Sequence, residues 1–105
     1  MKFLVTSHNK DSYFALAPEK RMQLLAEAYA YIEKYRKAGK LKEAFYTPDL
    51  KGMVSVWDVA SSEEAARLVI ENPTLAFQDI ETQALIEFDV AKEVLTDYVK
   101  KMAKK

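Results

Sequence analysis

Residues 52–82 read GMVSVWDVASSEEAARLVIENPTLAFQDIET, and this stretch decides the fold. Its first part, residues 54–59, is short, β-branched and aromatic, which predicts a buried strand. Ser61 then stands three residues before Glu64, the spacing of a capping box, so we expect a helix to follow. Polar and apolar residues begin to alternate at Asp79, where a second strand opens. Strand, helix and strand in this order predict a crossover unit whose partners lie elsewhere in the chain.

The length and the charge of the chain limit its class. A chain of 105 residues, half of them hydrophobic, predicts a single domain over residues 1–105 with one sizeable core. Sixteen basic and sixteen acidic residues cancel, so no net field steers the chain toward nucleic acid or an anionic membrane. We therefore expect neither as a partner.

Residue types that are missing exclude further kinds of site. The chain has no cysteine, which excludes disulfides, thiolate zinc sites and cysteine nucleophiles. With only two glycines there is no glycine-rich phosphate loop, and no Asp/Glu cluster has the spacing of metal ligands. The apolar run in MKFLVTSHN is too short for a signal peptide, and no segment approaches the roughly 20 apolar residues of a spanning helix. We expect a cytoplasmic protein without a metal or a cofactor.

The remaining elements follow from hydrophobic periodicity and from turn residues. A β-branched run at the start, buried on both faces, is followed by a polar loop at residues 8–12 and by a helix that Pro18 opens and Gly39 ends. An apolar stripe of period 3.6 near the C-terminus predicts a terminal amphipathic helix. The expected elements are strand 2–7, helix 18–38, strand 41–47, strand 54–59, a helix from Ser61 to 70, strand 79–88 and a helix that includes residues 91–102.

This order predicts an α+β protein with a ferredoxin-like βαββαβ arrangement, a four-stranded antiparallel sheet and an added C-terminal helix. Helices on one face of such a sheet leave the other face to be covered. On strand 54–59, Trp57 lies on one side while Val54 and Val56 lie on the other, so both faces are expected to be buried. Two protomers that pair sheet to sheet, as a dimeric α/β barrel, satisfy this pattern.

The central stretch also carries a family resemblance. Residues 55–59 read SVWDV, Ser61 precedes the helix, and Pro73, Phe77 and the triplet DIE at 79–81 follow it. This series resembles the muconolactone isomerase family, which has a strand of the form SVFDV, a serine, a helix and then PLFPYMDIE. The likeness runs without a gap through this stretch and extends more weakly over nearly the whole chain.

The resemblance implies a ferredoxin-like protomer, a barrel dimer and a higher ring-like assembly. It also implies an enzyme that moves a double bond in an unsaturated lactone by taking up and returning a proton, without a cofactor, with acidic and basic side chains on the first helix. Lys20 matches a family lysine, and Glu27 stands one position away from the family glutamate. Residues 87–89, which read EFD, replace the histidine and proline that follow the last strand in the family.

Proton transfer needs a base within reach of an acidic C–H and a donor at the developing enolate. The candidate catalytic residues are Glu27 and His8 as base, with Lys20, Tyr46 or Tyr29 as the donor. Each also has a plain structural interpretation, because a lone histidine in a loop and charged residues on a helix surface commonly face solvent.

The candidate substrate-binding residues are aromatic. Trp57, Tyr29 and Tyr46 are suited to a pocket wall for a ring, and equally to packing in the core or at a dimer interface. The leading hypothesis is a cofactor-independent enzyme for a small apolar or aromatic ligand. Two alternatives stay open, namely a non-catalytic ligand-binding or assembly protein of the same fold and a cofactor-free oxygenase.

Overall fold

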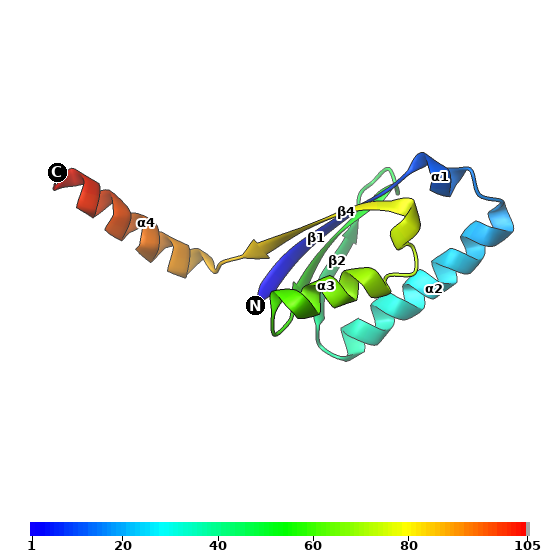
Figure 1. The fold of residues 1–105 in the computed structure, drawn as a ribbon, viewed down its shortest axis with the longest axis horizontal. Coiled ribbons are helices and arrows are strands. Elements are labelled where there is room, and N and C mark those ends of the chain that lie inside the picture. The colour runs from blue at the N-terminus through cyan, green and yellow to red at the C-terminus, as the bar shows by residue number, and fades with distance from the viewer. Residues whose placement is uncertain (105) are drawn as a thin grey trace.

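A four-stranded antiparallel sheet forms the centre of the computed structural model, which describes residues 1–104 (Figure 1). The strand order is β2-β3-β1-β4, so the first strand is central although it is first in the chain. This confirms the ferredoxin-like arrangement with an added C-terminal helix. The strands are β1 Lys2–Asn9, β2 Leu41–Tyr46, β3 Gly52–Asp58 and β4 Gln78–Leu85, and the helices are α1 Asp11–Phe14, α2 Pro18–Lys37, α3 Ser62–Glu71, the 3₁₀ turn η1 Leu75–Phe77 and α4 Phe88–Ala103.

Helices α2 and α3 cover one face of the sheet (Figure 1). Buried apolar side chains from this face and from both helices form the core, namely Phe3, Tyr35, Leu41, Trp57, Val59 and Leu68. The predicted cap of α3 is confirmed, because the Glu64 N–H donates to the Ser61 hydroxyl at 3.1 Å. The Glu64 carboxylate in turn accepts from the Ala60 N–H at 2.8 Å. These two bonds satisfy N–H groups at the start of the helix.

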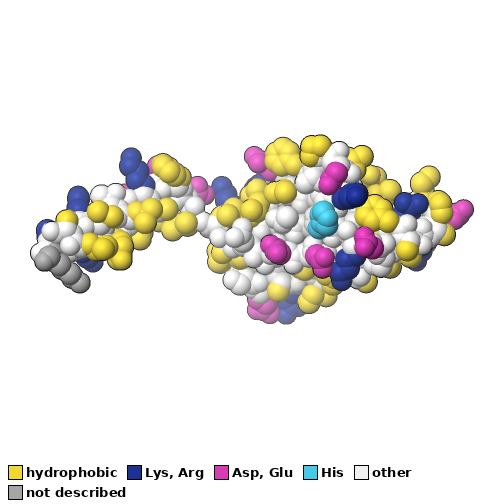
Figure 2. All heavy atoms as spheres, turned by 90° about the horizontal axis from the view of Figure 1, so that it is seen from above, with side chains coloured by type: hydrophobic (Ala, Val, Ile, Leu, Met, Phe, Trp, Pro, Cys, Tyr) yellow, Lys and Arg dark blue, Asp and Glu magenta, His cyan; other side chains and the backbone are white. Residues whose placement is uncertain are grey.

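Among residues 1–104, no helix lies over the other face of the sheet (Figure 1). Residues of β1 alternate between the two faces, so Leu4, Thr6 and His8 lie on the open face. Thr6 and His8 are exposed, which corrects the prediction that this strand is buried on both faces. Figure 2 looks onto this face and shows the histidine among acidic and basic side chains. Within one chain, the sheet therefore has a covered face and an open face.

The segment after β1 differs from the predicted loop at residues 8–12. The strand continues to Asn9, because the Asn9 N–H donates to the Lys51 carbonyl and the Lys10 N–H donates to the Phe77 carbonyl, both at 2.8 Å. These bonds tie the end of the strand to the segments on both sides. The one-turn helix α1 follows directly at Asp11–Phe14.

The predicted last strand, 79–88, is too long at its C-terminal end. β4 stops at Leu85, which pairs with Lys2, the first residue of β1. Beyond that pair β1 offers no further residue, so the chain leaves the sheet and α4 begins at Phe88. Lys2 and Glu87 form a salt bridge of 3.1 Å beside this exit.

Helix α4 extends away from the sheet and the other helices (Figure 1). It is amphipathic as predicted, but its apolar stripe is exposed, with Leu95 at 62% and Tyr98 at 60%. No helix within residues 1–104 is long and apolar enough to cross a membrane.

Candidate functional site

A cavity of about 310 Å³ lies between the covered face of the sheet and helix α2. On α2, lining residues recur at the spacing of one helical face, including Leu25, Ala28, Tyr29 and Ile32. On β3, Met53, Ser55 and Trp57 line it because alternate residues of a strand share a face. The cavity thus uses the same two surfaces that form the core.

Aromatic side chains supply much of the cavity wall. They come from four different elements, α1, α2, β2 and β3, and are Tyr13, Tyr29, Tyr31, Tyr46 and Trp57. The Trp57 ring centroid lies 6.0 Å from that of Tyr31 and 5.6 Å from that of Tyr35, and the two tyrosine rings meet edge to face at 5.0 Å. Such contacts hold aromatic rings in defined orientations.

Hydrogen bonds fix this wall further. The Trp57 indole N–H donates to the Ser55 hydroxyl at 2.9 Å, and the Ser55 hydroxyl lies 3.4 Å from the Val5 carbonyl. On α2, the Tyr31 hydroxyl donates to the Leu68 carbonyl and the Tyr35 hydroxyl to the Glu71 carboxylate, which ties α2 to α3. The wall is therefore organised before any ligand arrives.

A second group of lining residues is polar and uncharged. The Gln78 amide donates to the Asn9 side-chain oxygen at 2.9 Å, and the Asn72 amide donates to the Gln78 oxygen at 3.3 Å. The Asn72 oxygen accepts from the Thr74 hydroxyl at 2.8 Å and from its N–H at 3.0 Å. Asn9, Asn72, Thr74 and Gln78 thus form a connected row of amides and a hydroxyl along the cavity.

Two tyrosines of the cavity, Tyr46 and Tyr31, have raised pKa values. Burial raises the pKa of Tyr46, with a further rise from the neighbouring Tyr29 and Tyr13 hydroxyls. Burial likewise raises the pKa of Tyr31, to which Tyr35 and Glu71 add. Both phenols therefore stay protonated well above neutral pH.

The three predicted substrate-binding residues, Trp57, Tyr29 and Tyr46, all line this cavity. Tyr13 and the amides of Asn9 and Gln78 also line the cavity and were not predicted. The last two face each other across β1 and β4, in a register that no local pattern of the sequence reveals. The composition of an aromatic wall was predictable, and the polar row was not.

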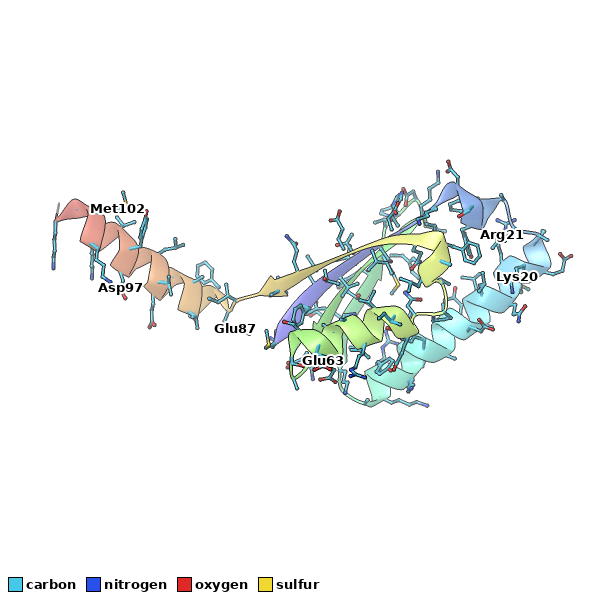
Figure 3. The ribbon with its side chains drawn as sticks, in the orientation of Figure 1. Lys20, Arg21, Glu63, Glu87, Asp97 and Met102 are labelled. Carbon is cyan, nitrogen blue, oxygen red and sulfur yellow. The ribbon has the colours of Figure 1, made fainter. Side chains whose placement is uncertain are left out.

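The three predicted catalytic residues do not meet in the cavity of a single chain. Glu27 is exposed and lines a separate, shallow groove together with Tyr31, Lys34 and Glu71. His8 lies on the open face of the sheet, because its neighbours Ser7 and Asn9 are the residues of β1 that reach the cavity. Lys20 is exposed in the first turn of α2 (Figure 3). Among residues 1–104 no group of three or more His, Asp or Glu side chains is placed to hold a metal ion.

The sheet order and the two covering helices define a ferredoxin-like fold, with an aromatic cavity between the sheet and α2. Residues 1–91 match the family described as muconolactone delta-isomerase. The chain belongs to that family. Among curated protein sequences none matches the chain.

Two solved structures share the fold. A muconolactone isomerase is 22% identical, with a TM-score of 0.73 over 83% of this chain and 90% of that chain. A 5-chloro-2-hydroxyhydroquinone dehydrochlorinase from Burkholderia phenoliruptrix AC1100, solved with 2,5-dihydroxybenzoquinone, is 16% identical, with a TM-score of 0.69 over 85% of this chain and 97% of that chain. At these identities the likeness concerns the fold.

Proposed function

We propose that this protein is a cofactor-independent enzyme that isomerises an unsaturated lactone or a related ring compound by proton transfer. The supporting observation is the cavity, in which an ordered aromatic wall lies beside protonated tyrosine hydroxyls. Membership of the muconolactone delta-isomerase family supports the reaction type. The dehydrochlorinase structure, with a quinone bound, supports a ring compound as the ligand.

The proposed reaction moves one proton and one double bond. A base takes a proton from the γ-carbon of the α,β-unsaturated lactone, and the electron pair of the broken C–H bond delocalises through the C=C bond onto the carbonyl oxygen. Tyr46 and Tyr29 line the cavity and donate hydrogen bonds to that oxygen as its charge develops, which lowers the barrier. The proton then returns to a different carbon, so the product is an isomer and nothing else is consumed.

Glu27 is the base we favour among the predicted catalytic residues. Its groove and the cavity share the lining residue Tyr31, and Ala28, the next residue of α2, lines the cavity. His8 and Lys20 lie farther from this arrangement, on the open face and at the exposed start of α2. They remain proposals for a base and a donor in an assembled protein, where the open face is covered.

The test compares lactone isomerisation by the wild type and by Glu27→Gln, with Glu33→Gln on the same helix as the matched control. General-base catalysis contributes roughly 10²–10⁴-fold to a rate, so we expect a loss of that order in Glu27→Gln only. Equal rates in the wild type and Glu27→Gln would exclude Glu27 as the base.

A ligand-binding protein without catalysis is the second candidate. One observation favours it, namely that no carboxylate, imidazole or amine from the described chain lines the cavity. Under this hypothesis the protein binds ring compounds and returns them unchanged. Binding without any isomerisation, by the wild type, would decide for it.

We also propose that two copies pair through their open sheet faces. Leu4, Val54 and Val56 lie on the open face and are half-buried in a single chain, and α4 carries an exposed apolar stripe without a partner. A second copy of the chain supplies an apolar surface that covers both the open sheet face and the stripe of α4. Homo-oligomer formation and a cytoplasmic location remain predictions.

A further inference from the structure

The hydrogen bonds in the polar row of the cavity all run in one direction. The Thr74 N–H and hydroxyl donate to the Asn72 side-chain oxygen, at 3.0 and 2.8 Å. The Asn72 NH₂ group donates to the Gln78 oxygen at 3.3 Å, and the Gln78 NH₂ group donates to the Asn9 oxygen at 2.9 Å. The row therefore begins at Thr74 and ends at Asn9.

The backbone of Thr74 sets this direction. A backbone N–H can only donate, so the Asn72 side chain turns its oxygen toward Thr74 and its NH₂ group toward Gln78. Gln78 then presents its oxygen to Asn72 and its NH₂ group to Asn9. The orientation of each amide thus follows from the one before it, and Asn9 must accept with its oxygen.

The Asn9 NH₂ group is the free end of the row. Among residues 1–104 it has no hydrogen-bond acceptor, whereas the side-chain oxygens of Asn9, Gln78 and Asn72 each accept at least one bond. Asn9 is half-buried and lines the cavity. The row therefore offers N–H donors, and a ligand group that binds at its end must be an acceptor.

Backbone hydrogen bonds hold Asn9 in place on both sides. Its N–H donates to the Lys51 carbonyl, and the N–H of the next residue, Lys10, donates to the Phe77 carbonyl, both at 2.8 Å. Asn9 also pairs with Gln78 in the register of β1 and β4. A donor that is already fixed loses little conformational freedom when a ligand binds, so it favours ligands whose acceptor reaches that position.

We propose that Asn9 binds an acceptor oxygen of the carbonyl type on the ligand ring, and that Gln78 positions Asn9 for this contact through the polar row. The inference rests on the proposed function, because it names the residues that recognise a substituent of the ligand in the same cavity. Asn9 takes no part in the proton transfer itself.

Two probes of the same shape isolate the acceptor oxygen. 4-Hydroxyacetophenone and 4-isopropenylphenol differ in one position, where the first has a carbonyl oxygen and the second a CH₂ group. Calorimetric titration gives the affinity of each probe and hence their ratio. Because the difference in hydrophobicity between the probes is the same for every protein, a change in the ratio between the wild type and a variant reports the contact to the oxygen.

Asn9→Asp tests the polarity of the free end. The substitution keeps the oxygen that accepts from Gln78 and replaces the NH₂ group by a second oxygen of similar size. An acceptor then faces the acceptor of the ligand. We expect the affinity for 4-hydroxyacetophenone to fall about tenfold relative to that for 4-isopropenylphenol.

A matched pair of glutamines in β4 tests the positioning role. Gln78→Met removes the donor that holds the Asn9 oxygen, so the affinity ratio should fall several-fold. Gln83→Met makes the same change at an exposed position, opposite Leu4 on the open face of the sheet. This control should keep the ratio of the wild type.

The outcomes separate this inference from the proposed enzyme function. An unchanged ratio in Asn9→Asp and Gln78→Met, or no binding of either probe by the wild type at millimolar concentration, would overturn the inference, whether or not the protein isomerises lactones. A ratio that falls in both variants and stays in Gln83→Met, in a protein that isomerises no lactone, would support the inference and refute the enzyme.

Discussion

Ser55 and Trp57 lie two residues apart on the same side of β3, and the Trp57 indole N–H donates to the Ser55 hydroxyl at 2.9 Å. Both side chains are buried and both line the cavity. A single hydrogen bond therefore connects the hydrophobic core with the candidate site. Stability and ligand binding should depend on it together.

Ser55→Ala removes the partner of the Trp57 N–H and leaves a buried donor unsatisfied. We expect the free energy of unfolding to fall by about 1–3 kcal/mol and the affinity for ring compounds to fall as well. Urea denaturation measures the first and calorimetric titration the second. Ser62→Ala, at an exposed position, is the control, and an unchanged urea midpoint for Ser55→Ala would refute this reasoning.

Tyr35 should make the protein less stable at alkaline pH. Its hydrogen bond to Glu71, with burial and the Glu71 and Glu64 charges, raises the pKa of Tyr35 from 10.0 to about 12. Between these values the unfolded chain has released a proton that the folded protein still holds, so stability falls as the pH rises. Below pH 10 this contribution is fully present.

Urea midpoints measured from pH 8 to 11 test this directly. Tyr35→Phe should show a shallower alkaline decline than the wild type, although its stability at neutral pH is lower through the lost hydrogen bond to Glu71. Tyr98→Phe, which alters an exposed tyrosine of α4, should keep the wild-type decline. If the wild type and Tyr35→Phe lost stability equally as the pH rises, the raised pKa of Tyr35 would not be the cause of the alkaline decline.

The apolar stripe of α4 should drive association. In the proposed assembly Leu95 is buried against a second copy, so Leu95→Gln should weaken self-association, while Glu93→Gln on the same helix should not. Light scattering at several protein concentrations measures the mass. A wild type that stays monomeric at every concentration would rule out the dimer.

Local patterns predicted most of the fold. Three signals were predictable because each acts within a few residues of the chain. They are the capping box at Ser61, Pro18 at the start of α2, and Gly39, which has a positive φ of 76°, at the end of α2. The end of β4 was not predictable from local sequence, because it depends on where β1 begins. That is a long-range property of the sheet, and Leu85 stops the strand only because it pairs with Lys2.

The site was less predictable for the same reason. Trp57 lines the cavity because it lies on the strand face that forms the core, and Tyr29 and Tyr46 line it although they are about half exposed. The face of the sheet on which His8 lies depends on the strand register, because a shift of one residue moves a side chain to the opposite face. In the observed register His8 lies on the open face, away from the cavity. The row of Asn9, Gln78 and Asn72 joins segments far apart in the sequence, so no spacing could have revealed it.

The central claim is that the aromatic cavity on the covered face binds a small ring compound. Ala28 lines this cavity and Ala26, two residues away on α2, is exposed, so Ala28→Phe fills the cavity and Ala26→Phe is its matched control. We would titrate all three proteins with 4-hydroxybenzamide and follow Trp57 fluorescence. The structure predicts saturable binding by the wild type and Ala26→Phe and none by a folded Ala28→Phe. Equal binding by all three proteins would place the ligand elsewhere and contradict the claim.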